Sequence, residues 1–421
     1  MKKILVLAVI SLASAVMAET AIIENVIVRQ RWPWSKVVDI DFTVRGNATG
    51  VKFVAKYDGA EQFVLAEKDL TGDFCDVLEP GLHHVTWDPA KAGLSETELK
   101  NFTISVEPDD TDRTYLILNL YDGSYRYAAA EPEGGWLADE ANWKTNIVFR
   151  RVPKGTRKLG IAKEFKSVMT ISGYAAEHEV TLTSDFYLSV FMTTGAQRTF
   201  IASRMTGNQP NLSGFSKSFD SRTYHQVRGR VADGINWPNT RHDVNTGTVI
   251  ANLRTVVKST FPPEWIVDLP TSCQWEYAAK GTNSLDQLLS VGGKLTDENF
   301  HENYTNLLDN VAIWFNNVGD GSRSEIGRKL PNGWGFYDMI GLGFEWVTDW
   351  SNNSPSFYSG VDPVGPDSGT KRIRRSVYTY KPNTDNLIYY TTAYVGEYDP
   401  TDESKNCGYR ICINLKNMFR K

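Results

Sequence analysis

The chain has few cysteines for its length. Only Cys75, Cys273, Cys407 and Cys412 occur in 421 residues, which is too few for a protein held together by a disulfide framework. If Cys407 and Cys412 share one strand, their odd spacing places their side chains on opposite faces, so they should not pair with each other. We therefore expect mostly buried thiols and at most one disulfide bridge.

Long apolar runs are absent beyond the N-terminus, so the sequence predicts no membrane anchor. Lys2 and Lys3 precede an apolar run from Ile4 to Val16, and Val16-Met17-Ala18 is a small-residue cleavage site. This order is typical of a secretory signal peptide. We expect residues 1–18 to be removed after Ala18 and the mature protein to be exported to the periplasm or the extracellular space.

No excess of positive charge marks this sequence. The formal net charge is −5, and the longest basic cluster is the short one at 371–375, which argues against a nucleic-acid-binding protein. The six histidines are scattered, so no site with two histidines and a carboxylate can be predicted. Nucleophile triads, phosphate-binding glycine loops and zinc spacings are absent as well.

Residues 24–106 carry the pattern of short β-strands. Val38, Ile40, Phe42 and Val44 alternate with polar residues, which is the period of a half-buried strand. Similar short segments recur with turn signals about every ten residues, as in a β-sandwich. We predict an immunoglobulin-like β-sandwich over residues 19–108, followed by a polar linker at 107–113.

Two segments further along have helical periodicity. Apolar residues recur at helical spacing over 249–257. Thr271 with Gln274 three residues later forms a capping box for a second helix, which should end near Gly281. The chain should thus combine strands and helices in an α+β fold.

An ordered set of motifs spans about 146–415. It includes LPTSCQWEYAAKG at 269–281, PNGWGFYDMIGLGFEWVTDW at 331–350 and GYR at 408–410. This set resembles the sulfatase-modifying-factor, or formylglycine-generating enzyme, family. The resemblance implies a second domain over 114–421 with a C-type-lectin-like fold: small twisted sheets, two main helices and extensive loops.

The resemblance also implies a copper ion held by two cysteines five residues apart, at positions where this sequence has none. Cys407 and Cys412 have that spacing, but they flank the GYR segment at 408–410, where the family has a structural strand. Counting from Ser376, the two positions fall on Thr379 and Thr384. Hydroxyls are poor ligands for Cu(I), which selects soft thiolates. We therefore expect no copper, and no catalytic residues of the family's kind.

Calcium is the cofactor that the resemblance leaves open. One site would involve Asn310, Val311 and Asp320, and the other Ile340, Gly341, Gly343 and Glu345. Carbonyls and carboxylates suit this hard cation. The family's asparagine after Gly341 is Leu342 here, however, and the alternative is that Glu345 caps its own loop.

Three functions are compatible with these observations. The first is a binding module for a glycan or peptide, with aromatic and basic residues of two long loops as its contacts: Tyr224, Trp237, Arg241, Tyr378, Tyr389 and Tyr390. Those aromatics could equally pack irregular loops. The second is an oxidoreductase of the formylglycine-generating or non-haem-iron type with different chemistry. The third is a structural role at the cell surface, with the first domain as a docking module.

Overall fold

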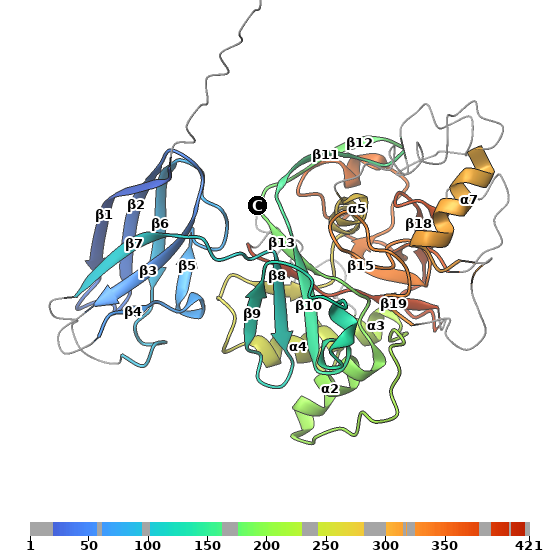
Figure 1. The fold of residues 1–421 in the computed structure, drawn as a ribbon, viewed down its shortest axis with the longest axis horizontal. Coiled ribbons are helices and arrows are strands. Elements are labelled where there is room, and N and C mark those ends of the chain that lie inside the picture. Colours follow the sequence, from blue (N-terminus) through green and yellow to red (C-terminus); the bar gives the residue numbers. More distant parts are fainter. Residues whose placement is uncertain are drawn as a thin grey trace, which may run out of the picture. The chain divides into compact units, whose positions relative to one another are not determined.

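The computed structural model describes residues 20–56, 61–94, 102–161, 176–229, 243–281, 300–314, 317, 325–378, 389–403 and 406–416. Backbone contacts divide the chain into two compact units, 1–110 and 111–421 (Figure 1). The described residues form several small sheets and fewer helices, which is a mixed α+β architecture. None of the described helices is long and apolar enough to cross a membrane.

The first unit consists of two antiparallel sheets, with strand orders β1-β2-β6-β5 and β4-β3-β7. The alternation at 38–44 produces the predicted strand, since the four apolar side chains of β2 are buried. Phe42 of one sheet packs edge-on against Phe53 of the other, with ring centroids 5.8 Å apart. The strands are β1 Ile22–Gln30, β2 Val38–Arg45, β3 Gly50–Lys56, β4 Phe63–Val64, β5 Leu70–Gly72, β6 Gly81–Trp87 and β7 Thr103–Asp109, with the short helix η1 Glu67–Asp69.

The predicted linker at 107–113 is in part a strand. Strand β7 continues to Asp109 because residues 107–109 pair with the start of β3. Their acidic side chains are tolerated since they lie on an exposed face. Strand pairing therefore overrides the polar composition up to Asp109, and β8 begins at Tyr115.

The described residues of the second unit form three sheets. Their orders are β14-β20-β13-β10-β8-β9, β11-β12-β16 and β18-β17-β15-β19. The segment around the GYR motif contributes β19 to one sheet and β20 to another. The strands are β8 Tyr115–Asn119, β9 Tyr125–Ala128, β10 Asn146–Val152, β11 Gly155–Leu159, β12 His178–Leu182, β13 Phe186–Ser189, β14 Ile266–Asp268, β15 Phe344–Trp350, β16 Gly360–Val361, β17 Arg372–Arg375, β18 Val395–Tyr398, β19 Cys407–Tyr409 and β20 Cys412–Asn414.

Both predicted helices are present, as α4 and α5. The capping box of Thr271 and Gln274 starts α5, and Gly281 follows its last residue. The helices are α1 Ala141–Lys144, α2 Gly195–Thr206, α3 Tyr224–Val227, α4 Val249–Val257, α5 Ser272–Lys280 and α7 Phe300–Val311, with the short helices η2 Trp136–Ala138 and η5 Pro355–Tyr358.

The expectation of only two main helices is wrong. Helices α2 and α7 each have 12 residues and are longer than the two predicted ones. Helix α2 buries only Ala196, Gln197, Phe200 and Ile201. Its apolar stripe is therefore too short to produce a clear helical period in the sequence. Thr194 forms a capping box with Gln197, so capping and packing make this segment helical.

Candidate functional site

A buried polar cluster joins the three motifs of the family-like segment. Trp275 of α5 is fully buried, and its Nε1–H donates to Glu345 Oε2 at 2.8 Å. The Nε–H of Arg410 lies 3.0 Å from both carboxylate oxygens of Glu345. Arg410 also donates to two backbone carbonyls at the end of β13. The motifs therefore meet inside the core, where all three side chains are inaccessible to a ligand.

A second buried ion pair involves Glu276, the residue that follows Trp275 in α5. Arg375 Nη2 is 2.5 Å from Glu276 Oε2, and the other Glu276 oxygen accepts from the amide of Gly160 at 2.6 Å. Burial raises the pKa of Glu276, but Arg375 and Lys280 outweigh it, so the pKa lies below its ordinary value. For Glu345 burial prevails, and its pKa lies above the ordinary value. Both carboxylates support the fold.

All four cysteines are buried and free, as expected. Cys407 and Cys412 begin β19 and β20, which belong to different sheets, so they do not share one strand. The Sγ of Cys273 contacts the carbonyl of Tyr358 at 3.2 Å. Burial raises the pKa of the Cys273, Cys407 and Cys412 thiols above the ordinary range. Since the thiolate is the metal ligand, these thiols do not fit a copper ion. Thr379 and Thr384 lie outside the described residues.

Two oxygen donors of the second predicted calcium segment, the Gly341 carbonyl and the Glu345 carboxylate, are already engaged. The Gly341 carbonyl accepts from the amide of Gly343 at 2.8 Å and from the hydroxyl of Ser376 at 3.1 Å. Glu345 is engaged by Arg410 and Trp275, so it does not cap its own loop either. Ile340 belongs to the same buried turn. A calcium ion needs six to eight oxygen ligands, and the loop at 340–345 does not fit one in this arrangement.

The first predicted calcium segment is only partly described. Asn310, the penultimate residue of α7, donates from Nδ2 to the carbonyl of Asn306 at 3.2 Å. The backbone of Val311 lies at the end of α7, and Asp320 lies outside the described residues. Within the described ranges, no group of three or more His, Cys, Asp or Glu side chains could hold a metal ion.

Two of the predicted ligand contacts belong to the core. Tyr224 is fully buried, with Trp346 edge-on to its ring at 5.8 Å and the guanidinium of Arg372 4.6 Å from its centroid. Tyr390 is fully buried against Trp314 at 5.6 Å. The prediction that Tyr224 and Tyr390 face a ligand is therefore wrong, because irregular loops use these rings for packing.

The other predicted contacts are half-buried or undescribed. Tyr378 and Tyr389 are half-buried, and Tyr389 packs edge-on against Tyr394 with centroids 4.8 Å apart. Trp237 and Arg241 lie outside the described residues. The described structure therefore does not bring this set together as one aromatic surface.

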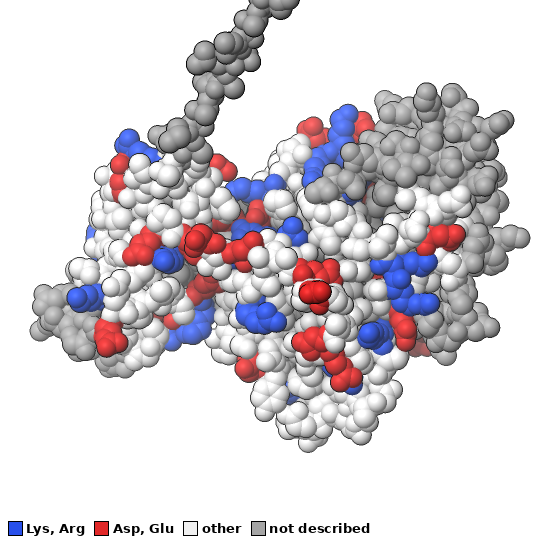
Figure 2. Space-filling view, viewed as in Figure 1, with Lys and Arg blue, Asp and Glu red and all other residues white. Residues whose placement is uncertain are grey.

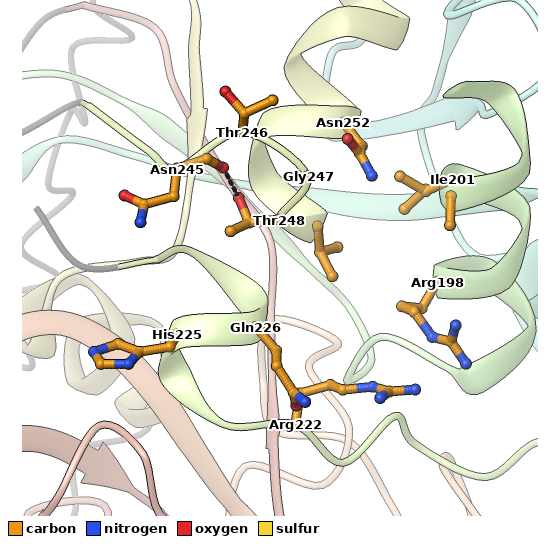
Figure 3. A pocket seen from close by; sticks show the side chains of 12 residues that line it. Arg198, Ile201, Arg222, His225, Gln226, Asn245, Thr246, Gly247, Thr248 and Asn252 are labelled. Atoms are coloured by element: carbon orange, nitrogen blue, oxygen red, sulfur yellow. Dashed lines mark hydrogen bonds between the residues drawn. The ribbon is translucent and has the colours of Figure 1, made fainter. Parts of the chain in front are cut away.

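A pocket of about 470 Å³ lies where α2, α3 and the start of α4 meet (Figure 3). Arg198 projects from α2, Arg222 from the turn before α3, and His225 from α3 itself. Thr248 and Asn252 line the opposite side, at the N-terminal end of α4. Threonine side chains cap the start of each of the three helices, which fixes the backbone around the pocket.

Asp220 holds the two pocket arginines in place. Its Oδ1 lies 3.4 Å from Arg198 Nε and 3.3 Å from Arg222 Nε. Its Oδ2 accepts from the hydroxyl of Tyr409 at 3.0 Å. Burial raises the pKa of Asp220, against the opposing effect of the two arginines. Two guanidinium groups facing one carboxylate leave this side of the pocket with a net positive charge.

The sequence contained no signal for this pocket. Arg198, Asp220 and Arg222 are isolated polar residues, and only folding brings α2 beside α3. A backbone hydrogen bond from the amide of Asp220 to the carbonyl of Thr193 at 2.7 Å joins the two segments. The loop at 206–245 was predicted as a ligand surface and contains the pocket residue His225, but the paired arginines Arg198 and Arg222 were not predicted.

The chain resembles known proteins over its second unit. Residues 138–415 match the family model of the sulfatase-modifying factor enzyme 1-like domain. The formylglycine-generating enzyme of Bos taurus is 29% identical over 148 residues, which cover 35% of this chain and 38% of that enzyme. The enzyme of Streptomyces coelicolor is 31% identical over 151 residues, covering 35% and 46%. The matched part therefore spans less than half of each of these relatives.

Two solved structures match part of the chain at low sequence identity. The Treponema denticola variable protein 1 matches with a TM-score of 0.42 and 19% identity, over 64% of this chain and 95% of that one. PvdO from Pseudomonas aeruginosa matches with a TM-score of 0.44 and 15% identity over the same shares. The family model itself covers more than half of the chain. The protein therefore belongs to the family of sulfatase-modifying factor enzyme 1-like domains.

Proposed function

We propose that this protein is an exported, non-catalytic binding module for a glycan or peptide ligand. One observation carries the proposal: no cysteine occurs between Cys273 and Cys407. Formylglycine-generating enzymes would need two thiolates converging on Cu(I) in that region, because soft ligands hold this ion. The buried, protonated thiols of the second unit support the same conclusion.

The pocket between α2, α3 and α4 is the proposed ligand site. It is concave and lies within the size range of small-molecule sites, about 300–1,000 Å³. Its polar groups converge from three helices, which fixes their positions in the free protein. The half-buried Tyr378 and Tyr389 remain proposed contacts for a larger ligand, together with Trp237 and Arg241.

Neither nucleic acid nor a membrane anchor is part of the proposal. On the face shown in Figure 2, acidic and basic side chains are interspersed on each unit and form no continuous basic patch. A nucleic-acid-binding protein typically carries a basic stripe or patch. We also propose that the two sheets of the first unit form an immunoglobulin-like β-sandwich, whose role is docking or spacing.

Export leads to a specific N-terminus. We expect the mature protein to begin at Glu19, because the small residues before it match a signal-peptidase site. Mass spectrometry of protein recovered from the periplasm or the medium measures this directly. Soluble cytoplasmic protein that retains Met1 would contradict export.

We propose that calcium binds at the segment that contains Asn310 and that Glu345 takes no part in this binding. Excess calcium should then raise the melting temperature of the wild-type protein by a few degrees, as binding to the native state does. Asn310→Ala should abolish this shift, whereas a calcium response should persist in Glu345→Gln, whose carboxylate is already paired with Arg410. Loss of the response in Glu345→Gln with full retention in Asn310→Ala would contradict the assignment.

A glycan and peptide array with the mature protein tests the binding function. The expected result is a set of hits that share one chemical feature and compete with one another. A positive array result should be repeated with the Arg222→Gln variant, because Arg222 lines the pocket. Failure to bind any glycan or peptide would contradict the proposed function.

A further inference from the structure

We infer that the pocket between α2, α3 and α4 recognises the carboxylate of an acidic oligosaccharide, that is, a uronic-acid type of sugar. This inference rests on the proposed binding function and names the class of ligand. Three features of the pocket support it: two guanidinium groups with free ends, a buried carboxylate that orients them, and several hydroxyl and amide groups elsewhere in the lining.

The two pocket arginines, Arg198 and Arg222, have terminal N–H groups that make no hydrogen bond within the described structure. Arg198 and Arg222 contact Asp220 only through their Nε atoms, and neither side chain makes another hydrogen bond or ion pair in the described structure. Their terminal nitrogens are therefore available. Figure 3 shows both guanidinium groups on the same side of the pocket, close to each other. The planar fork of a guanidinium matches the two oxygens of a carboxylate, which favours bidentate binding.

Asp220 acts as a positioning residue. It is 5% exposed and is held by Tyr409 from the core side. Its single negative charge cannot neutralise two guanidinium groups, so a net positive charge remains for a ligand anion. The arginine side chains are only 28% and 33% exposed, so an ion pair formed there is screened less than one on the open surface.

The rest of the lining favours a sugar over a peptide. Asn245, Thr246, Gln226 and Asn252 provide amide and hydroxyl groups, which can both donate and accept like the hydroxyls of a saccharide. The Asn252 side chain has no hydrogen-bond partner in the described structure and points toward the pocket in Figure 3. Peptides are commonly bound along a free strand edge or in an aromatic groove. This pocket is lined by helices and turns and offers neither.

The test uses the mature protein and uronic-acid trisaccharides (galacturonate, glucuronate and mannuronate), each compared with its neutral methyl ester. Calorimetry should detect at least one acid, with its ester at least about ten-fold weaker. Arg198→Gln and Arg222→Gln should each weaken binding of the acid by roughly ten-fold to a hundred-fold, as expected for a lost charged hydrogen bond. The melting temperature of each variant verifies folding, and Arg198→Lys and Arg222→Lys, which keep the charge but lose the fork, should bind with intermediate affinity.

Arg204 provides a matched control on the same helix. It lies over the ring of Tyr121 at 4.9 Å and does not line the pocket, so Arg204→Gln should bind the acid like the wild type. The carboxylate inference is overturned if the ester binds as tightly as the acid. It is also overturned if no acidic saccharide binds while the array finds another ligand. In both cases the proposed binding function still stands. An acidic peptide whose binding is lost in Arg222→Gln would overturn the choice of a sugar. An array without any hit would overturn the binding function itself.

Discussion

Replacing Trp275 by alanine should lower the free energy of unfolding of the second unit by about 3–5 kcal/mol. The indole is fully buried in α5, and its N–H is the hydrogen-bond donor to Glu345 Oε2 at 2.8 Å. The substitution therefore leaves a large cavity and removes one partner of a buried carboxylate. Because a domain is stable by only about 5–15 kcal/mol, the variant should express poorly or unfold at a clearly lower denaturant concentration.

Trp34 gives the matched control for this experiment. Its side chain is 90% exposed, so Trp34→Ala should change the free energy of unfolding by less than about 0.5 kcal/mol. Trp275→Phe should have an intermediate effect, because it keeps much of the apolar volume but loses part of the ring and the N–H donor. Urea unfolding followed by circular dichroism measures all three variants. A wild-type midpoint for Trp275→Ala would show that this side chain is not a core residue.

Removing Arg410 should destabilise the second unit by about 3–5 kcal/mol, because it leaves the Glu345 carboxylate buried without its cation. Both residues are 0% exposed in the ion pair. Arg410→Met keeps the apolar stem and removes the charge, so it isolates the ionic contribution. Unfolding curves should show the loss, and Arg204→Met, at a half-buried position of α2 outside this ion pair, should show a much smaller one.

The double variant Arg410→Met, Glu345→Leu should recover most of this stability. Buried pairs are often replaced by apolar residues at little cost, because the desolvation of both charges is avoided. Burial raises the pKa of Glu345 despite its two partners, which indicates that desolvation is not fully compensated here. A double variant as unstable as Arg410→Met alone would mean that the arginine acts through its bonds to backbone carbonyls.

The family and much of the local structure could be predicted from the sequence. The alternation at 38–44 and the capping box at Thr271 are local patterns, and each produced the expected element. The buried thiols were also predictable, since four scattered cysteines cannot form a framework. Helix α2 was not among the two helices predicted from periodicity, because its apolar stripe is short. Strand β7 is longer than predicted, because pairing with β3 overrides the acidic composition of its last residues.

The candidate site was less predictable because its residues are brought together by long-range contacts. Arg198 and Arg222 are oriented by Asp220, which is itself held by the hydroxyl of Tyr409, 189 positions away in the chain. The aromatic residues of the loops led to a wrong prediction of ligand contacts. Tyr224 and Tyr390 lie in loop-rich segments but are fully buried, because an irregular fold with small sheets needs large rings to fill its core.

The most direct test of the non-catalytic proposal is a single mass measurement. The purified mature protein is loaded with Cu(I) and incubated with a cysteine-containing sulfatase peptide, a reductant and oxygen, beside a metal-only control. We predict that the peptide keeps its cysteine mass, because no cysteine lies between Cys273 and Cys407 and the flanking thiols are buried. Formation of the formylglycine aldehyde above the metal-only control would contradict the proposal.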